Sequence, residues 1–119
     1  MLETIYEIED LKAFKSLLEN NPGLLIIKFG AEWCKPCNKI KDQVQQWFNK
    51  MPDTVQTVVV DVDVSFEVYA YLSNKKMLSG IPGILMYKQG NLNYVFDECV
   101  NTSKEEDIDL FFEKCVSYT

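Results

Sequence analysis

The feature of this sequence that most constrains its fold is an apolar run over residues 24–29, interrupted only by Lys28. The run is far shorter than the roughly 18 apolar residues that a membrane-spanning helix needs. A continuous apolar segment of this length is typical of a central strand that is buried on both faces. The run therefore predicts an α/β fold in which helices cover both faces of a sheet.

Segments of strand and helix periodicity alternate along the rest of the chain. Runs or alternation of apolar and β-branched residues predict strands over residues 4–8, 24–29, 54–60, 84–87 and 92–96. Amphipathic spacing predicts helices after an Asp10 cap, around residues 40–51, over residues 65–72 and after the capping-box pattern of residues 103–106. The predicted order is β-α-β-α-β-α-β-β-α. Strands joined by helices pair in parallel and the late hairpin adds antiparallel strands, so we expect a central mixed β-sheet.

The length of the chain predicts how many domains it forms. Domains of about 100–150 residues are the most common, so the 119 residues predict a single domain over residues 1–119. The scaling of area with mass gives a folded surface of about 6,600 Å² and buries about two-thirds of the unfolded chain's surface. A core of that size requires no structural disulfide or metal.

The charged residues exclude several kinds of chemistry. Eighteen acidic and twelve basic residues give a net charge of −6, and every base is a lysine because the chain has neither arginine nor histidine. Without histidine there is no Ser-His-Asp or Cys-His nucleophile system and no histidine metal site. Without arginine there is no bidentate clamp for phosphate, and an acidic chain without a basic stripe is a poor partner for nucleic acid. The four cysteines are therefore the leading candidates for chemistry.

The N-terminal segment bears on the compartment. It has no positively charged stretch followed by an apolar one, so we expect no signal peptide, no membrane association and a cytoplasmic location. Cysteines in that compartment usually stay reduced unless they are catalytic or bind metal.

One motif stands out, Cys34-x-x-Cys37, directly after the buried strand and at the start of the second helix. Two intervening residues allow a turn to bring the two sulfurs within bonding range. The N-terminus of a helix offers unpaired N–H groups and partial positive charge, which stabilise a thiolate on the first cysteine. Pro36 fits the first helical turn and limits the flexibility of the loop. The pair is therefore predicted to be redox-active rather than structural.

The segment around this motif resembles the active site of the thioredoxin family. Residues 29–37 read Phe-Gly-Ala-Glu-Trp-Cys-Lys-Pro-Cys, whereas the family usually has Trp-Cys-Gly-Pro-Cys after an apolar strand. Residues 80–90 are similar to the family's cis-proline strand and the hairpin that follows it, and residues 60–63 match the end of its middle strand. The resemblance covers essentially the whole chain and implies the thioredoxin fold.

The resemblance also implies roles for individual residues. Cys34 would be the exposed nucleophile that attacks a client disulfide, and Cys37 would resolve the mixed disulfide. Trp33 would supply an apolar wall beside the sulfur. The main chain at Ile81 would pair with an extended client segment, next to a cis Pro82 that faces the two cysteines.

The function implied by the resemblance is that of a protein disulfide reductase, acting as a monomer. The Cys34–Cys37 pair would carry the electrons, so no bound cofactor is expected. Disulfide-containing proteins would be the clients, and a thioredoxin reductase would be the electron donor. Two alternatives remain open: a disulfide oxidase or isomerase, and a thioredoxin-fold binding module whose thiols are incidental.

Three departures from the family pattern concern charge. The family usually has a buried Asp six residues before the first cysteine, which helps to deprotonate the resolving cysteine, and this chain has Lys28 there. A charged Lys28 would favour thiolate, whereas a neutral one could accept a proton, and the sequence does not decide between them. Lys35 replaces the glycine between the cysteines and adds positive charge beside Cys34. Acidic residues 97 and 98 fall near a groove glycine of the family, which favours basic clients.

The remaining two cysteines are predicted to lie outside the site. Cys115 belongs to the apolar face of the last helix, so we expect it to be buried. Cys99 follows the last predicted strand in a segment expected to be exposed, as an inert residue or a regulatory thiol. Sixteen positions separate the two, and no histidine is present, so no zinc site is expected.

Overall fold

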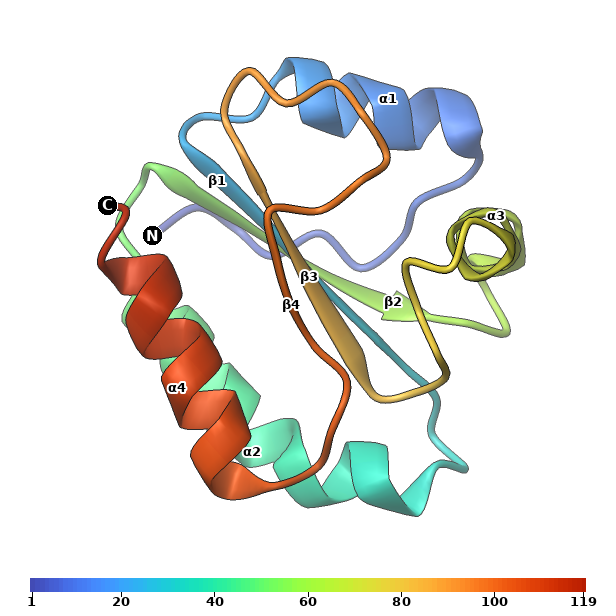
Figure 1. Cartoon of the computed structure of the whole chain (residues 1–119), viewed down its shortest axis with the longest axis vertical. Helices are drawn as coiled ribbons and strands as arrows, with labels where there is room; N and C mark the ends of the chain where they lie inside the picture. Colours follow the sequence, from blue (N-terminus) through green and yellow to red (C-terminus); the bar gives the residue numbers. More distant parts are fainter.

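The apolar run of residues 24–29 lies in β1 (Leu24–Gly30), and all seven residues of this strand are buried. The computed structural model describes residues 1–119 and places β1 between β2 (Val55–Asp61) and β3 (Gly83–Lys88), with β4 (Glu98–Val100) at the edge beyond β3. β1 runs parallel to β2 and antiparallel to β3, and β4 runs antiparallel to β3 (Figure 1). The central buried strand and the mixed sheet are thus confirmed.

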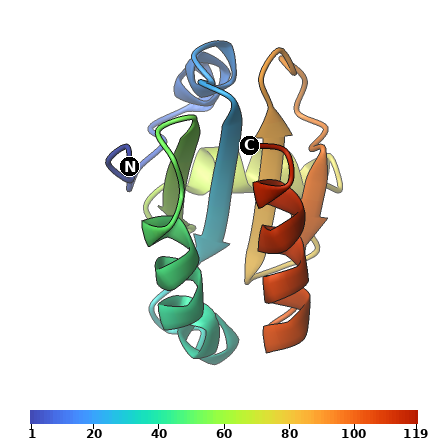
Figure 2. The same cartoon turned by 90° about the vertical axis from the view of Figure 1, so that its left-hand side faces the viewer.

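Two helices cover each face of the sheet. Alternate residues of β1 point to opposite faces, so Leu25 and Ile27 pack with α1 (Leu11–Glu19) and α3 (Phe66–Asn74). Leu24 and Ile26 pack with α2 (Lys35–Asn49) and α4 (Glu105–Val116). Figure 2 shows α2 and α4 side by side in front of the sheet, with α3 behind it. By the same alternation Lys28 belongs to the face that α2 covers. The accessible surface, 6589 Å², agrees with the scaling expectation.

The sequence predicts a side-chain cap for the first helix and for the last helix, and only the first of these caps is present. The Asp10 carboxylate accepts a hydrogen bond from the Ala13 N–H at 2.7 Å, which confirms the predicted cap of α1. The capping box predicted at residues 103–106 is wrong, because Lys104 occupies the N-cap of α4 and no side chain caps the helix. Three acidic residues in the first turn of α4 interact favourably with the helix dipole instead. None of the helices is long and apolar enough to span a membrane.

The strand predicted at residues 4–8 is reduced to a single bridge between Ile5 and Val58. Two backbone hydrogen bonds fix this bridge, from the Ile5 N–H to the Thr57 carbonyl and from the Val59 N–H to the Ile5 carbonyl. The chain then leaves the sheet edge, because the Ile8 N–H donates to the buried Ser65 hydroxyl rather than to a strand. The structure therefore lacks the first strand of the predicted order and begins with α1.

The strand predicted at residues 92–96 is wrong, and the strand that pairs with β3 lies slightly later, in β4. Asparagine side chains explain the difference. The Asn91 side-chain carbonyl accepts from the Asn93 N–H, and the Asn93 side-chain carbonyl in turn accepts from the Val95 N–H, each at 2.9 Å. In these local turns the side chains accept hydrogen bonds from backbone N–H groups that, in a strand, would donate to the neighbouring strand.

Candidate active site

The cysteine pair lies where β1 ends and α2 begins. Cys34 and Cys37 form a disulfide with their Cα atoms 5.2 Å apart. Cys34 is the N-cap of α2, and its sulfur accepts a hydrogen bond from the Cys37 N–H at 3.3 Å. Pro36 occupies the first turn, where it removes no helical hydrogen bond, because the first N–H groups of a helix have no intrahelical partner. The predicted strand–turn–helix placement of the motif is confirmed.

Both cysteines are buried in this oxidised state. Cys34 is 5% exposed and Cys37 is 3% exposed, so the expectation of an exposed nucleophile is wrong here. The two residues belong to the same buried apolar cluster as Ala31 and Val62. The neighbouring Trp33, by contrast, is 69% exposed. The indole beside the pair is therefore far more accessible than the two cysteines themselves.

The turn that follows β2 holds the active-site segment in place. The Trp33 indole N–H donates to the Asp63 carboxylate at 2.8 Å. The Val62 N–H donates to the Gly30 carbonyl at 3.0 Å. Asp63 was not among the predicted site residues. The sequence match of residues 60–63 to the family includes Asp63 but does not indicate a role for its side chain. The hydrogen bond to the Trp33 indole supplies that role.

The segment before β3 completes the site. The peptide bond between Ile81 and Pro82 is cis, and β3 begins with Gly83 paired opposite Phe29. Phe29 lies near the C-terminal end of β1. This register therefore brings Pro82 to the end of the sheet at which the cysteine motif starts. The Asn101 side-chain amide donates to the carbonyls of Gly80 and Pro82, both at 3.2 Å. Asn101 is a positioning residue that no sequence motif indicated.

The comparisons with known proteins agree with this arrangement. The family model for thioredoxin matches residues 6–114. This chain belongs to the thioredoxin family. Among its relatives, Thioredoxin 3 of Plasmodium falciparum is 32% identical over 90 residues, which cover 76% of this chain and 47% of the relative. The thioredoxin of Ophiophagus hannah is 30% identical over 85% of this chain and 92% of the relative.

Solved thioredoxin structures share the fold. A Plasmodium falciparum thioredoxin superposes with a TM-score of 0.71 at 29% identity, covering 96% of this chain and 89% of that chain. Fasciola hepatica thioredoxin, at 22% identity, has a TM-score of 0.73, with 97% and 100% covered. The chain spans only about half the length of several curated thioredoxins that it matches, from 47% to 57%.

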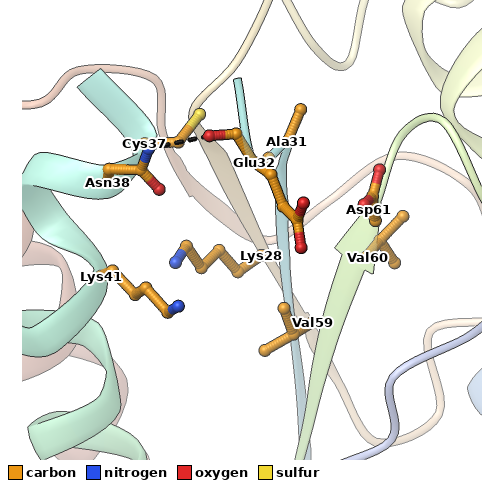
Figure 3. Close-up of a pocket in the computed structure, with 10 residues that line it drawn as sticks. Lys28, Ala31, Glu32, Cys37, Asn38, Lys41, Val59, Val60 and Asp61 are labelled. Carbon is orange, nitrogen blue, oxygen red and sulfur yellow. Dashed lines mark hydrogen bonds between the residues drawn. The ribbon is translucent and has the colours of Figure 1, made fainter. Parts of the chain in front are cut away.

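Lys28, a departure from the thioredoxin pattern, shares a cavity with Cys37. The cavity measures about 150 Å³ and is lined by Lys28, Cys37, Lys41 and seven further residues. Figure 3 shows Lys28 reaching from β1 toward α2 and Lys41 reaching back from α2. Lys28 is 8% exposed and forms neither of the two ion pairs of the structure. Burial, and then the charge of Lys41, lower the pKa of Lys28 below its ordinary value.

Lys35, the second departure, lies outside this cavity. Its side chain is exposed at the start of α2, directly after Cys34. The two lysines predicted to modulate the thiols thus lie beside different cysteines: Lys28 lines a cavity with Cys37, and Lys35 follows Cys34 on the solvent-exposed side of the turn.

The other predicted features lie apart from the site. Cys99 is exposed and Cys115 is buried, both as free thiols, as expected. Burial, and then Glu98, raise the pKa of Cys115 to about 12, so this thiol stays protonated at neutral pH. Glu98 forms an ion pair with Lys114 at 3.1 Å, and Asp97 accepts from the Lys88 N–H. Both acids thus make contacts within the fold.

Proposed function

We propose that this chain is a thiol-disulfide oxidoreductase that reduces disulfides of client proteins. The observation that carries the proposal is the Cys34–Cys37 disulfide at the N-terminus of α2. An oxidase or isomerase and a pure binding module remain less favoured, because no feature of the structure or of the relatives points specifically to either.

The reaction transfers two electrons from the dithiol to the client. The Cys34 thiolate attacks one sulfur of the client disulfide, and the other client sulfur leaves as a thiolate and takes a proton from solvent. The Cys37 thiol loses its proton, and its thiolate then attacks the Cys34 sulfur. The bond between Cys34 and the client breaks, the second client thiolate leaves, and the Cys34–Cys37 disulfide forms.

Cys34 is assigned as the nucleophile because its sulfur lies at the N-cap. There it accepts the Cys37 N–H and interacts with the positive end of the helix dipole, both of which stabilise a thiolate. Lys35 adds a solvent-screened positive charge to the same sulfur. Pro36 keeps the turn between the cysteines rigid.

Cys37 is assigned as the resolving thiol, with Lys28 as a modulator of its proton transfer. The support is the shared cavity, which places an unpaired amine and the Cys37 side chain around the same space. A neutral amine there is able to accept the Cys37 proton, and an ammonium group favours the thiolate. In both protonation states Lys28 assists the loss of the Cys37 proton.

Client contacts are assigned to Trp33, Ile81 and Pro82. The exposed indole offers an apolar surface beside the disulfide. Ile81 is partly exposed at the sheet edge, where its main chain is available to an extended client segment, and the buried Pro82 shapes that edge.

The wider setting is part of the same proposal. A thioredoxin reductase would supply electrons, as in the family generally, and the protein would act in the cytoplasm as a monomer with a single domain over residues 1–119. Two free cysteines, Cys99 and Cys115, are consistent with a reducing compartment.

Reduction of insulin disulfides with a dithiol as the electron source tests the function. The parent protein should accelerate the reaction, and Cys34→Ser should abolish the acceleration because it removes the attacking sulfur. Cys99→Ser, which removes an exposed thiol outside the site, is the matched control and should retain the activity. No acceleration by the parent with either a dithiol or a thioredoxin reductase would overturn the proposal.

A further inference from the structure

A groove lies between α1 and the segment that follows β3, at the end of the sheet opposite the cysteine pair. Lys88, the last residue of β3, pairs with Leu24 at the start of β1, whereas the cysteine motif follows the end of β1. Figure 1 shows α1 and the segment after β3 at the opposite end of the sheet from the start of α2. The groove measures about 310 Å³. We name it the α1 groove, and its eight lining residues are Leu11, Phe14, Lys15, Leu18, Tyr71, Leu92, Asn93 and Tyr94.

Aromatic rings form the inner walls of the α1 groove. Phe14 is 4% exposed and packs edge-on against the buried Tyr87, with the ring centroids 5.8 Å apart. The Tyr87 hydroxyl donates to the Tyr94 carbonyl at 2.7 Å, and the Tyr94 ring meets the Tyr71 ring edge-on at 5.8 Å. The Lys75 ammonium lies over both tyrosine rings, 5.8 and 5.4 Å from their centroids. The walls are thus held by contacts from β3 and α3.

The outer wall is held by the asparagine turns after β3. The Asn91 side-chain amide donates to the Val95 carbonyl at 2.9 Å, and the Asn93 side-chain carbonyl accepts from the Val95 N–H at 2.9 Å. Leu92, between the two asparagines, lines the groove and is 59% exposed. A site whose walls are already ordered loses little conformational entropy when a ligand binds.

The two polar residues of the lining both offer hydrogen-bond donors. The Lys15 ammonium has donors only, and it forms neither of the two ion pairs of the structure. The carbonyl of the Asn93 side chain is already occupied by the Val95 N–H, so its amide N–H groups are the part left for a ligand. An apolar groove with donors and no carboxylate in its lining is suited to an apolar molecule that carries an anionic acceptor.

The charge around the groove agrees with this chemistry. The segments that line it, residues 11–18, 71–76 and 89–96, contain four lysines and no acidic residue, although the whole chain has a net charge of −6. The acids that border these segments in the sequence are Asp10, Glu19 and Asp97. The first and the third already accept hydrogen bonds from backbone N–H groups. A local excess of lysines around an apolar groove is complementary to an anionic ligand.

We propose that the α1 groove binds a small apolar carboxylate, such as a medium-chain fatty acid or an arylalkanoate. Its hydrocarbon part would lie against Phe14 and Leu18, and its carboxylate would accept from Lys15 and Asn93. The volume of about 310 Å³ is within the range of about 300–1,000 Å³ for small-molecule pockets. A stable protein interface involves about 20–30 residues a side, many more than the eight that line the groove. The site is separate from the cysteines, and the inference does not depend on the proposed function.

Octanoate is the probe, and octanol and octylamine are its neutral and cationic counterparts with the same alkyl chain. Titration followed by the backbone amide shifts in NMR spectra measures affinity and location together. Octanoate should shift the amides of Lys15 and of residues 92–94 with a Kd of about 1 mM. Octanol should bind about threefold more weakly and octylamine more weakly still, because neither has an anion for the lysine. Added salt should reduce the preference for octanoate.

Two pairs of variants separate the contribution of charge from that of apolar contact. Lys15→Gln should weaken octanoate about threefold and leave octanol unchanged, whereas Lys12→Gln, which removes an exposed α1 lysine outside the lining, should change neither by more than about 1.5-fold. Leu92→Ser should weaken both probes about fivefold. Val95→Ser removes an exposed apolar residue of the same segment that does not line the groove, and should leave both affinities unchanged.

Binding is measured without turnover, so a failure here is independent of the thiol chemistry. Shifts spread over the surface, or equal affinities for the three probes, would show non-specific adsorption and overturn the inference. A peptide that carries leucines beside glutamates and binds the groove more than about tenfold tighter than octanoate would assign it to a protein partner instead. A parent that sediments as a dimer, with Leu92→Ser a monomer, would assign it to a second copy of the chain and would also overturn the inference.

Discussion

At the scale of single residues, the least usual group is the amine of Lys28. An unpaired lysine in a strand core is destabilising when it is charged, because burial removes its hydration. Its pKa is lowered by burial and by Lys41, so part of that cost is relieved by loss of the proton. A residue of this kind is retained more readily for chemistry than for stability, and its cavity is shared with Cys37.

The buried amine of Lys28 should make the stability of the protein depend on pH. Lys28→Met should raise the free energy of unfolding at pH 7 by about 1–2 kcal/mol, because it replaces a buried amine with an apolar side chain of similar length. The folded-state pKa of Lys28 is lowered, so the unfolded chain binds more protons between that value and the ordinary value of 10.5. The stability of the parent should therefore increase as pH rises through this window, and the advantage of the variant should shrink.

Urea unfolding of both proteins between pH 6 and pH 10.5 measures the effect. Lys12→Met, which removes an exposed lysine from α1, is the matched control for the change in net charge. A difference between Lys28→Met and the parent that stays constant with pH would contradict the assignment.

Lys28 should also influence the titration of the thiol that shares its cavity. Lys28→Asp places a negative charge in the cavity of Cys37, so it should raise the pKa of the Cys37 thiol in the reduced protein and leave that of Cys34 less affected. The Cβ chemical shifts of the two cysteines, followed by NMR as a function of pH, report both titrations. Identical titration curves for the variant and the parent would show that Lys28 does not influence proton transfer.

At the scale of helices and strands, much of the structure follows from local chemistry. The apolar run of β1 predicted its burial, and Asp10 predicted the start of α1. The same kind of reasoning failed at Ser103, because a side chain caps a helix only when the incoming backbone places it over the first N–H groups. It failed at residues 92–96 because the Asn91 and Asn93 side chains compete with the strand partner for hydrogen bonds.

The two predicted caps provide a direct comparison. Asp10→Ala should lower the free energy of unfolding by about 1 kcal/mol, since it removes the acceptor of the Ala13 N–H. Ser103→Ala should change it by less than about 0.5 kcal/mol, because no side chain caps α4. Chemical denaturation of the two variants measures both values. Equal losses in the two would mean that the cap geometry of one of them is different in solution.

In the molecule as a whole, three segments that are distant in the sequence meet at one end of the strands of the sheet. The cysteine motif after β1, the turn after β2 and the cis-proline segment before β3 meet because β1 lies between β2 and β3. The sequence motifs located the first and the third segments. They did not indicate Asn101, because its hydrogen bonds to the carbonyls of Gly80 and Pro82 join segments that are distant in the sequence. The thioredoxin fold is predictable from the sequence, whereas the hydrogen bonds that Asp63 and Asn101 make between distant segments are not.

Cys34 and Cys37 are assigned different roles, and trapping of a client distinguishes them. Cys37→Ser removes the resolving sulfur, so it should accumulate a mixed disulfide with insulin chains through Cys34. Peptide mapping by mass spectrometry under non-reducing conditions identifies the linked residue. Cys34→Ser should accumulate no comparable adduct. Adducts on Cys99 in Cys37→Ser, or equal adducts in the two variants, would contradict the assignment of Cys34 as nucleophile and Cys37 as resolving thiol.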